Sequence, residues 1–219
     1  EYQKAPFFNF ELHHRLASVE NIARKYYQNP WKRAIKKEGQ SGQYYFCDED
    51  EYIYLITHAH KHFAHAGCGI RTLVDEYVVL QQKTSMNWKY IKEELKRLEM
   101  DRFEEQLRKI AINAFGDGNV DAAGWKMIFY MLGGGTYGTT GNRIYNELKT
   151  IKKSNDKSVH WKYMKKRLFL EEDSVKDYFP LFYRHRILRV FLPFYRILKG
   201  CIVHPRKLIA EFKIWKNFR

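Results

Sequence analysis

From residue 48 onward, apolar residues recur at helical spacing in one segment after another. In residues 48–67 they fall three and four positions apart, and Gly67 provides a stop signal. A helix is also predicted before this segment, over residues 18–28. Similar stripes with caps or stops predict helices over residues 70–82, 87–98, 101–115, 121–132, 142–153, 161–170, 173–199 (interrupted at Pro180 and Pro193) and 206–217. The chain is therefore predicted to be mainly α (α+β), a helical array.

A different period occurs near the N-terminus. Phe8, Phe10 and Leu12 alternate with polar residues, which predicts a strand with one apolar and one polar face. Residues 43–47 predict a short aromatic strand that could pair beside it. Glu11 would lie on the polar face of the first strand. A carboxylate held there is either a ligand for a divalent metal or an ordinary solvated side chain.

The charge of the chain is strongly positive and unevenly distributed. Net charge is +14 and the pI is near 9.6, a balance that attracts polyanions without choosing among them. Residues 183–219 carry ten Lys or Arg against one acid, Glu211, with aromatic residues interspersed. This tract is suited to nucleic acid or to an acidic membrane surface. The alternative is a pair of core-packing helices whose outer faces are merely basic.

The cysteines give no structural framework. Cys47, Cys68 and Cys201 are odd in number and widely spaced, so they match neither a disulfide scaffold nor a Cys-x-x-Cys zinc site. A reducing, cytoplasmic location is therefore the expectation.

The helix over residues 48–67 carries a row of histidines along one flank. His58 and His62 are spaced to share one metal ion, but Ala59 replaces the Glu of a His-Glu-x-x-His site. The other interpretations are a structural or surface role, and contact with a nucleotide. In the last case Lys61 would neutralise phosphate oxygens and the histidines would donate hydrogen bonds.

Charged residues on the following helices have two interpretations each. Asp75 could orient one of the histidines from the neighbouring helix, or it could form a surface ion pair with Arg71. Glu94, Glu99, Glu104 and Glu105 alternate with Lys and Arg residues, which predicts a solvated face with local ion pairs.

Gly133-x-Gly135-x-x-Gly138 matches the letters of a dinucleotide-binding fingerprint. It follows a predicted helix rather than a strand, and no Lys-Ser or Lys-Thr completes a phosphate loop. The motif is therefore interpreted as a helix stop and a turn.

Three segments together resemble a known family. Phe10-Glu11-Leu12-His13, His58-Ala59-His60-Lys61-His62 and Leu73-Val74-Asp75 are similar to the uncharacterised nucleotidyltransferase family of the DNA polymerase β superfamily. Members of that superfamily hold two Mg²⁺ ions with three carboxylates. Two of these form an Asp-x-Asp pair after a Gly-Ser turn, and the third lies on a later strand between apolar residues. Phe10-Glu11-Leu12 resembles the third element.

The resemblance implies a function and a set of site residues. It implies Mg²⁺-dependent transfer of a nucleoside monophosphate from a nucleoside triphosphate to an unknown acceptor. Glu11 would be the metal ligand and catalytic carboxylate, and Lys61, His58, His62 and Asp75 would form the nucleotide-binding group. A non-catalytic basic helical module that binds nucleic acid or an anionic membrane is the alternative.

The Asp-x-Asp element has no match in strand context, since Asp48-Glu49-Asp50 begins a predicted helix. We therefore expect a truncated, inactive chain whose N-terminal β element would complete a nucleotidyltransferase sheet. The predicted divisions are a catalytic-sheet remnant (1–47), a helical domain (48–170) and basic amphipathic C-terminal helices (171–219).

Overall fold

The computed structural model describes residues 2–4, 8–10, 16–17, 22–116, 118–135, 138–153 and 158–218. Within these ranges the chain forms thirteen α-helices, one short 3-10 helix and four short strands. The prediction of a mainly α fold with a minor N-terminal β element is confirmed. The described residues form two compact units, one from Glu1–His60 and Leu73–Asn119, the other from Lys61–Thr72 and Val120–Arg219. The three-part division at residues 47 and 170 stays a prediction.

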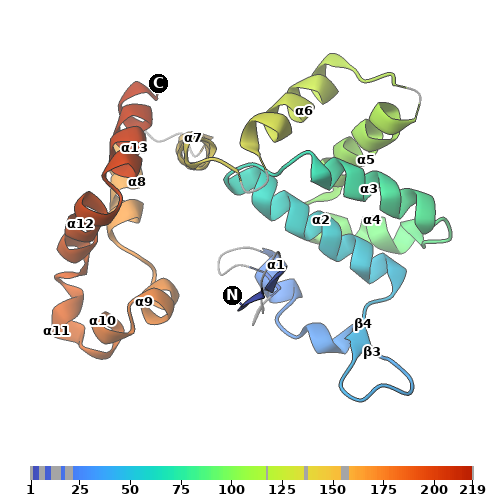
Figure 1. Cartoon of the computed structure of the whole chain (residues 1–219), viewed down its shortest axis with the longest axis horizontal. Helices are drawn as coiled ribbons and strands as arrows, with labels where there is room; N and C mark the ends of the chain where they lie inside the picture. Colours follow the sequence, from blue (N-terminus) through green and yellow to red (C-terminus); the bar gives the residue numbers. More distant parts are fainter. Residues whose placement is uncertain are drawn as a thin grey trace. The chain divides into compact units, whose positions relative to one another are not determined.

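The first unit is built on four long helices (Figure 1). Their bounds are α2 (Asp48–His65), α3 (Arg71–Gln82), α4 (Trp88–Arg97) and α5 (Asp101–Phe115). The apolar stripe of each helix faces the others, because burying these side chains removes them from water. The largest fully buried apolar side chains among them are Tyr52, Ile53, Ile56, Leu73, Ile91, Leu95 and Leu107.

The strands form two separate antiparallel pairs. β1 (Tyr2–Lys4) pairs with β2 (Phe8–Phe10), and β3 (Ile35–Lys36) pairs with β4 (Tyr44–Tyr45). The prediction that residues 43–47 pair beside the Phe8 strand is therefore wrong. A hairpin partner eight residues upstream closes a much shorter loop than a partner more than thirty residues away, which favours the local pairing.

Short elements connect these strands to α2. α1 (Ile22–Tyr26) follows the first strand pair, and the 3-10 helix η1 (Pro30–Lys32) leads into β3. Ala23 of α1 is buried, and the Tyr26 hydroxyl donates to Glu94 Oε2. Both residues therefore join α1 to the core.

The second unit contains the remaining helices. α7, α8 and α13 share a core of Ile144, Leu148, Val159 and Tyr163, with Trp215 packed against it. The bounds are α6 (Ala122–Gly134), α7 (Thr140–Lys153), α8 (Val159–Leu168), α9 (Glu172–Tyr178), α10 (Pro180–Arg184), α11 (Arg186–Arg189), α12 (Leu192–Val203) and α13 (Pro205–Asn217).

The glycine motif after α6 has a packing role. Gly135 follows the last turn of α6 with φ +58°, as expected for a helix stop. Gly138 has φ +73°, and a Cβ there would overlap the Ala66 carbonyl, which accepts a hydrogen bond from the Thr139 amide at 2.9 Å. Gly138 lets the chain pass closely over the end of α2.

Two acids predicted to lie on a solvated face are buried. Glu94 and Glu104 are each 3% exposed. Both keep a local cationic partner, since Arg97 pairs with Glu94 and Arg108 with Glu104. Each also binds groups far away in the sequence, which draws it into the helical core.

Candidate functional site

The residues predicted for the site lie in different places. Glu11 lies outside the residues that the structure describes. His58, Lys61 and His62 are half-buried along α2, and Asp75 is exposed on α3. Their roles stay predictions.

His58 belongs to a chain of aromatic contacts. Its ring lies 6.0 Å from the ring of Tyr54, and Tyr54 in turn lies 5.7 Å from Tyr27 and 6.4 Å from Phe46. His60 points elsewhere, with its ring 5.0 Å from that of Phe103, and burial lowers its pKa. His58 is therefore linked, through Tyr54, to the aromatic residues Tyr27 and Phe46 of the N-terminal segment.

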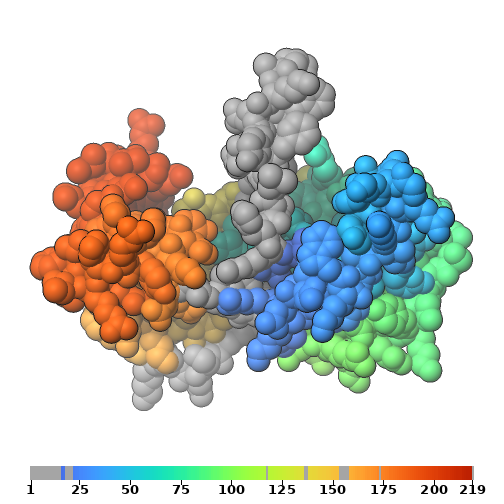
Figure 2. Space-filling view, turned by 90° about the horizontal axis from the view of Figure 1, so that it is seen from below, coloured from blue at the N-terminus to red at the C-terminus, as the bar shows by residue number. Residues whose placement is uncertain are grey.

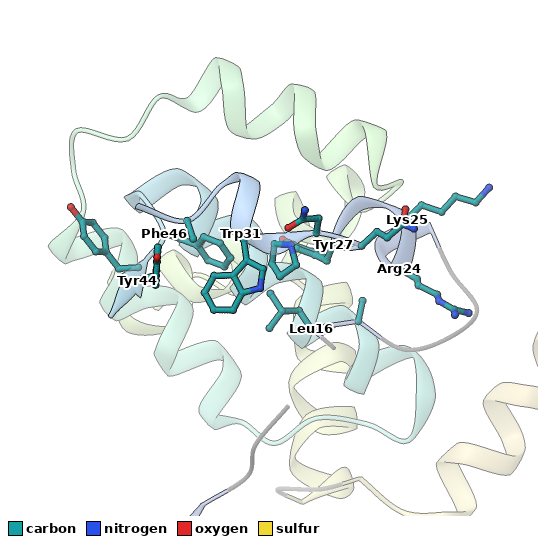
Figure 3. A pocket seen from close by; sticks show the side chains of 13 residues that line it. Leu16, Arg24, Lys25, Tyr27, Trp31, Tyr44 and Phe46 are labelled. Carbon is teal, nitrogen blue, oxygen red and sulfur yellow. The ribbon is translucent and has the colours of Figure 1, made fainter. Parts of the chain in front are cut away.

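These aromatic residues form the wall of a cavity of about 900 Å³. Trp31 stands in the middle of the opening, with Tyr44 and Phe46 on one side and Tyr27 on the other (Figure 3). The rings of Trp31 and Tyr44 meet edge to face at 5.2 Å. Cavities with mainly apolar walls and a few polar groups are typical of sites for small organic ligands.

Two cations lie at one end of the cavity. Arg24 and Lys25 are consecutive residues of α1 and line the end beside Tyr27, opposite Tyr44 (Figure 3). Both long side chains extend from α1 with their charged ends pointing away from Tyr27 (Figure 3). The cavity thus offers aromatic surface at its centre and positive charge at one end.

An ion-pair network holds the segment that carries Trp31. The Arg33 guanidinium donates to Asp50 Oδ1 at 3.0 Å, to the Tyr90 hydroxyl at 2.7 Å and to Glu94 Oε2 at 2.9 Å. It also lies over the Tyr26 ring at 4.2 Å. The network joins the segment to α2 and α4, and therefore fixes the position of Trp31 two residues away.

The protonation state of Glu94 follows from the same network. Burial alone would raise its pKa, but hydrogen bonds from Tyr26 and Arg33 outweigh burial and hold the pKa below its ordinary value. Glu94 is therefore a carboxylate at neutral pH, as an ion pair with Arg33 requires.

No three His, Cys, Asp or Glu side chains gather as a potential metal site within the described ranges. Glu11, the carboxylate predicted as a ligand, is outside those ranges.

Sequence reasoning missed the cavity. Its lining comes from residues 16–17 and 24–46, where the described elements are short and the sequence holds no recognised motif. The available signal was the concentration of Trp31, Tyr44, Tyr45 and Phe46 next to the basic pair of α1. His58 lies behind the wall through Tyr54, whereas Lys61, His62 and Asp75 are not among the described residues that line the cavity.

In the part of the chain that the structure describes, no helix combines the length and apolar composition needed to cross a bilayer. Comparison with curated proteins gives no match, and comparison with solved structures gives none either. A family model described as an uncharacterised nucleotidyltransferase matches residues 1–116. The match includes every residue that lines the aromatic cavity. The chain therefore belongs to this uncharacterised nucleotidyltransferase family.

Proposed function

We propose that the protein takes part in Mg²⁺-dependent transfer of a nucleoside monophosphate from a nucleoside triphosphate to an acceptor, and that the aromatic cavity binds the nucleotide. The observation that carries the proposal is the position of this cavity within the family match. The binding step rests on described residues, whereas the metal step rests on the family alone.

The centre of the cavity suits a nucleobase. Trp31 is 67% exposed at the opening, so one face of its ring is available to a planar ligand. The edge-to-face contact with Tyr44 limits the rotation of the Trp31 indole. Stacking of a base on an aromatic side chain contributes roughly 1–3 kcal/mol and tolerates any base. The proposal therefore gives Trp31 affinity for the base without strong preference among bases.

The cationic end suits the phosphates. Arg24 and Lys25 lie beside Tyr27, on the side of the cavity away from Tyr44 (Figure 3). A guanidinium binds two phosphate oxygens at once, and an ammonium acts as a point charge. A nucleotide with its base on Trp31 would thus direct its triphosphate toward α1.

The proposed reaction is a substitution at the α-phosphorus. The acceptor oxygen forms the new bond to that phosphorus, the bond to the oxygen bridging the α- and β-phosphates breaks, and pyrophosphate leaves with the electron pair. The acceptor loses its proton to water. Mg²⁺ would supply activation of the acceptor oxygen and charge neutralisation of the leaving group. Glu11 would be one of its ligands.

The predicted site residues of α2 and α3 take supporting roles in this proposal. His58 reaches the cavity wall through Tyr54, so it would position the wall rather than touch the base. Lys61, His62 and Asp75 would serve the acceptor or the outer phosphates. Asp75 is exposed on α3, where it is open to an incoming substrate.

The test is nucleotide-dependent release of pyrophosphate by the full-length protein, since a chain without the Asp-x-Asp element is expected to be inactive. It is measured with Mg²⁺ and each of the four common triphosphates. Because the acceptor is unknown, the assay adds fractions of a cell extract and follows a label on the α-phosphate. We expect transfer of the label that stops on chelation of the metal. Glu11→Gln should lower the rate by at least tenfold, since even residues one shell away from a metal cost about 10–100-fold. Glu38→Gln, an exposed acid, is the matched control.

Two outcomes would count against the proposal. Full activity of Glu11→Gln would remove the metal role of that carboxylate. Salt-sensitive binding to arbitrary nucleic acid, without any Mg²⁺-dependent affinity for nucleotides, would favour a non-catalytic basic module.

A further inference from the structure

A stripe of large apolar side chains runs along the outer face of α11 and α12. We call it the α11–α12 stripe, and its residues recur three or four positions apart, as one face of a helix requires. In Figure 2 the orange to red atoms of this segment lie at the surface. The stripe and its exposed fractions are Ile187 82%, Val190 70%, Phe191 59%, Phe194 70%, Ile197 47%, Leu198 61% and Ile202 72%.

The outward orientation of the stripe is fixed by contacts on the opposite face of α12. Leu192 is buried, and Arg196 Nη1 donates to the carbonyl oxygens of Arg167 at 2.8 Å and Leu168 at 3.0 Å. These carbonyls end α8, where a cation also interacts favourably with the helix dipole. Leu192 and Arg196 lie one turn apart, about half a turn around the helix from Phe194 and Leu198. α12 therefore turns Leu192 and Arg196 inward and the apolar residues of the stripe toward solvent.

The borders of the stripe are cationic. On the helices that carry or adjoin the stripe, α10 to α13, five cations are exposed: Arg184, Arg186, Lys199, Arg206 and Lys207. Arg189 has an acidic partner from α9, Glu172, at 3.4 Å. The only acid within residues 183–219 of the sequence, Glu211, is 7% exposed and accepts hydrogen bonds from Tyr163 and Arg167. The surface around the stripe thus presents positive charge.

An anionic bilayer surface matches this combination better than the other partners. Aliphatic residues such as Ile187, Leu198 and Ile202 neither stack on bases nor bind phosphate, so nucleic acid would leave them in water. A second copy of the chain would bring cationic borders against cationic borders. Acyl chains cover the apolar face while acidic headgroups meet the cations on both sides.

The dimensions favour a helix in the plane of the surface. α12 has 12 residues, which at 1.5 Å per residue span about 18 Å. The hydrocarbon core of a bilayer is about 30 Å thick. We propose that the α11–α12 stripe docks on the surface of a membrane containing acidic phospholipid, with its aromatic and aliphatic side chains inserted at the interface. The stripe lies outside residues 1–116, and the proposal does not depend on nucleotide transfer.

The first test is flotation of the full chain with vesicles of phosphatidylcholine alone or mixed with phosphatidylserine. We expect binding to the mixed vesicles. The double variant Phe194→Glu, Leu198→Glu should lower partitioning at least tenfold. Arg186→Gln and Lys207→Gln should each lower it about fivefold, the usual effect of one basic residue near an acidic surface. Phe129→Glu and Lys126→Gln, at exposed positions of α6, are matched controls that should bind as wild type.

Insertion of the α11–α12 stripe into the bilayer interface can be measured separately. Cys201 is an exposed free cysteine on the same face as Phe194 and Leu198. After Cys47→Ser, a polarity-sensitive fluorophore on Cys201 should shift its emission to the blue with mixed vesicles and be quenched by brominated acyl chains. Adsorption through charge alone would leave the emission unchanged, and this result would overturn the inserted stripe.

Other results would also overturn the proposal. One is equal flotation of the wild type and the Phe194→Glu, Leu198→Glu variant, provided both give the same helical circular dichroism. Equal binding to neutral and acidic vesicles would show that acidic headgroups do not contribute to docking. Binding to a DNA or RNA duplex without binding to vesicles would assign the tract to nucleic acid. Self-association that the double variant abolishes, without vesicle binding, would assign the stripe to a second copy.

Discussion

The Tyr52 hydroxyl lies 2.6 Å from Glu76 Oε1 in the interior of the first unit, between α2 and α3. The same hydroxyl lies 2.9 Å from Glu104 Oε1, which also accepts from Arg108 at 2.6 Å. A phenol carries one hydrogen, so it can donate to only one carboxyl group at a time. Both contacts are hydrogen bonds if a protonated Glu76 donates to Tyr52 and Tyr52 donates to Glu104.

This arrangement predicts a pH-dependent stability. Burial raises the pKa of Glu76 from 4.5 to about 7, and the nearby Glu104 adds to the rise. The pKa of Glu76 is higher in the folded state than in the unfolded state. The contribution of Glu76 to the free energy of unfolding is therefore fully present below pH 4.5 and is lost as the pH rises through 7. Glu76→Gln keeps a neutral side chain at every pH. Relative to this variant, the wild type should lose up to about 3 kcal/mol of unfolding free energy over that interval.

Urea unfolding at a series of pH values measures the difference. Glu93→Gln, at an exposed position of α4, is the control and should keep the wild-type slope. A Glu76→Gln variant whose stability follows the wild type in parallel across the interval would show that Glu76 ionises normally in the core.

Arg33 is predicted to be a main support of the cavity. Arg33→Ala leaves Asp50 and Glu94, whose side chains are 11% and 4% exposed, without their shared cation. Removing one partner of a buried ion pair costs roughly 3–5 kcal/mol. Arg97 still pairs with Glu94, so we expect the lower end, about 3 kcal/mol. Lys32→Ala, at the exposed neighbouring position, should change the free energy of unfolding little. Equal values for the two variants would contradict this role.

Gly138 is predicted to tolerate no side chain. Gly138→Ala places a Cβ against the Ala66 carbonyl, whereas a Cβ at Gly39 meets no described atom within 4 Å. The two residues share a positive φ, +73° and +72°, so the backbone strain of about 1–2 kcal/mol is common to both variants. The additional loss of unfolding free energy in Gly138→Ala, relative to Gly39→Ala, measures the clash with the Ala66 carbonyl and should be about 1–3 kcal/mol. Thermal unfolding of both variants checks it, and equal losses would refute the close approach.

Helix positions could be predicted from the sequence because their determinants are local. Residues 101–115 were predicted and observed with the same limits, and Asp121 caps α6 by accepting from the Gly124 amide at 2.7 Å. Each depends on residues within a few positions of one another, which periodicity and capping rules describe.

The environment of Arg33 could not be predicted in this way. Its partners Asp50 and Glu94 lie 17 and 61 residues away, and helical periodicity carries no information about pairs so distant. For the same reason Glu94 resembled a solvated residue. The described residues that line the cavity come from short elements and loops, so no periodic pattern in the sequence predicted its wall. The sequence showed the row of histidines in α2. It did not show that His58 is connected to the cavity, because this connection runs through the contact of Tyr54 with Tyr27, which is far away in the sequence.

Nucleotide binding by the aromatic cavity is the central claim, and calorimetric titration of the chain with Mg²⁺-nucleoside triphosphate tests it most directly. We predict saturable binding that Trp31→Ala weakens about tenfold, the lower part of the range for loss of one base stack. Trp161→Ala removes an equally large side chain that is 71% exposed on α8 and should bind as the wild type does. Absence of binding, or equal affinity of Trp31→Ala and the wild type, would contradict the account.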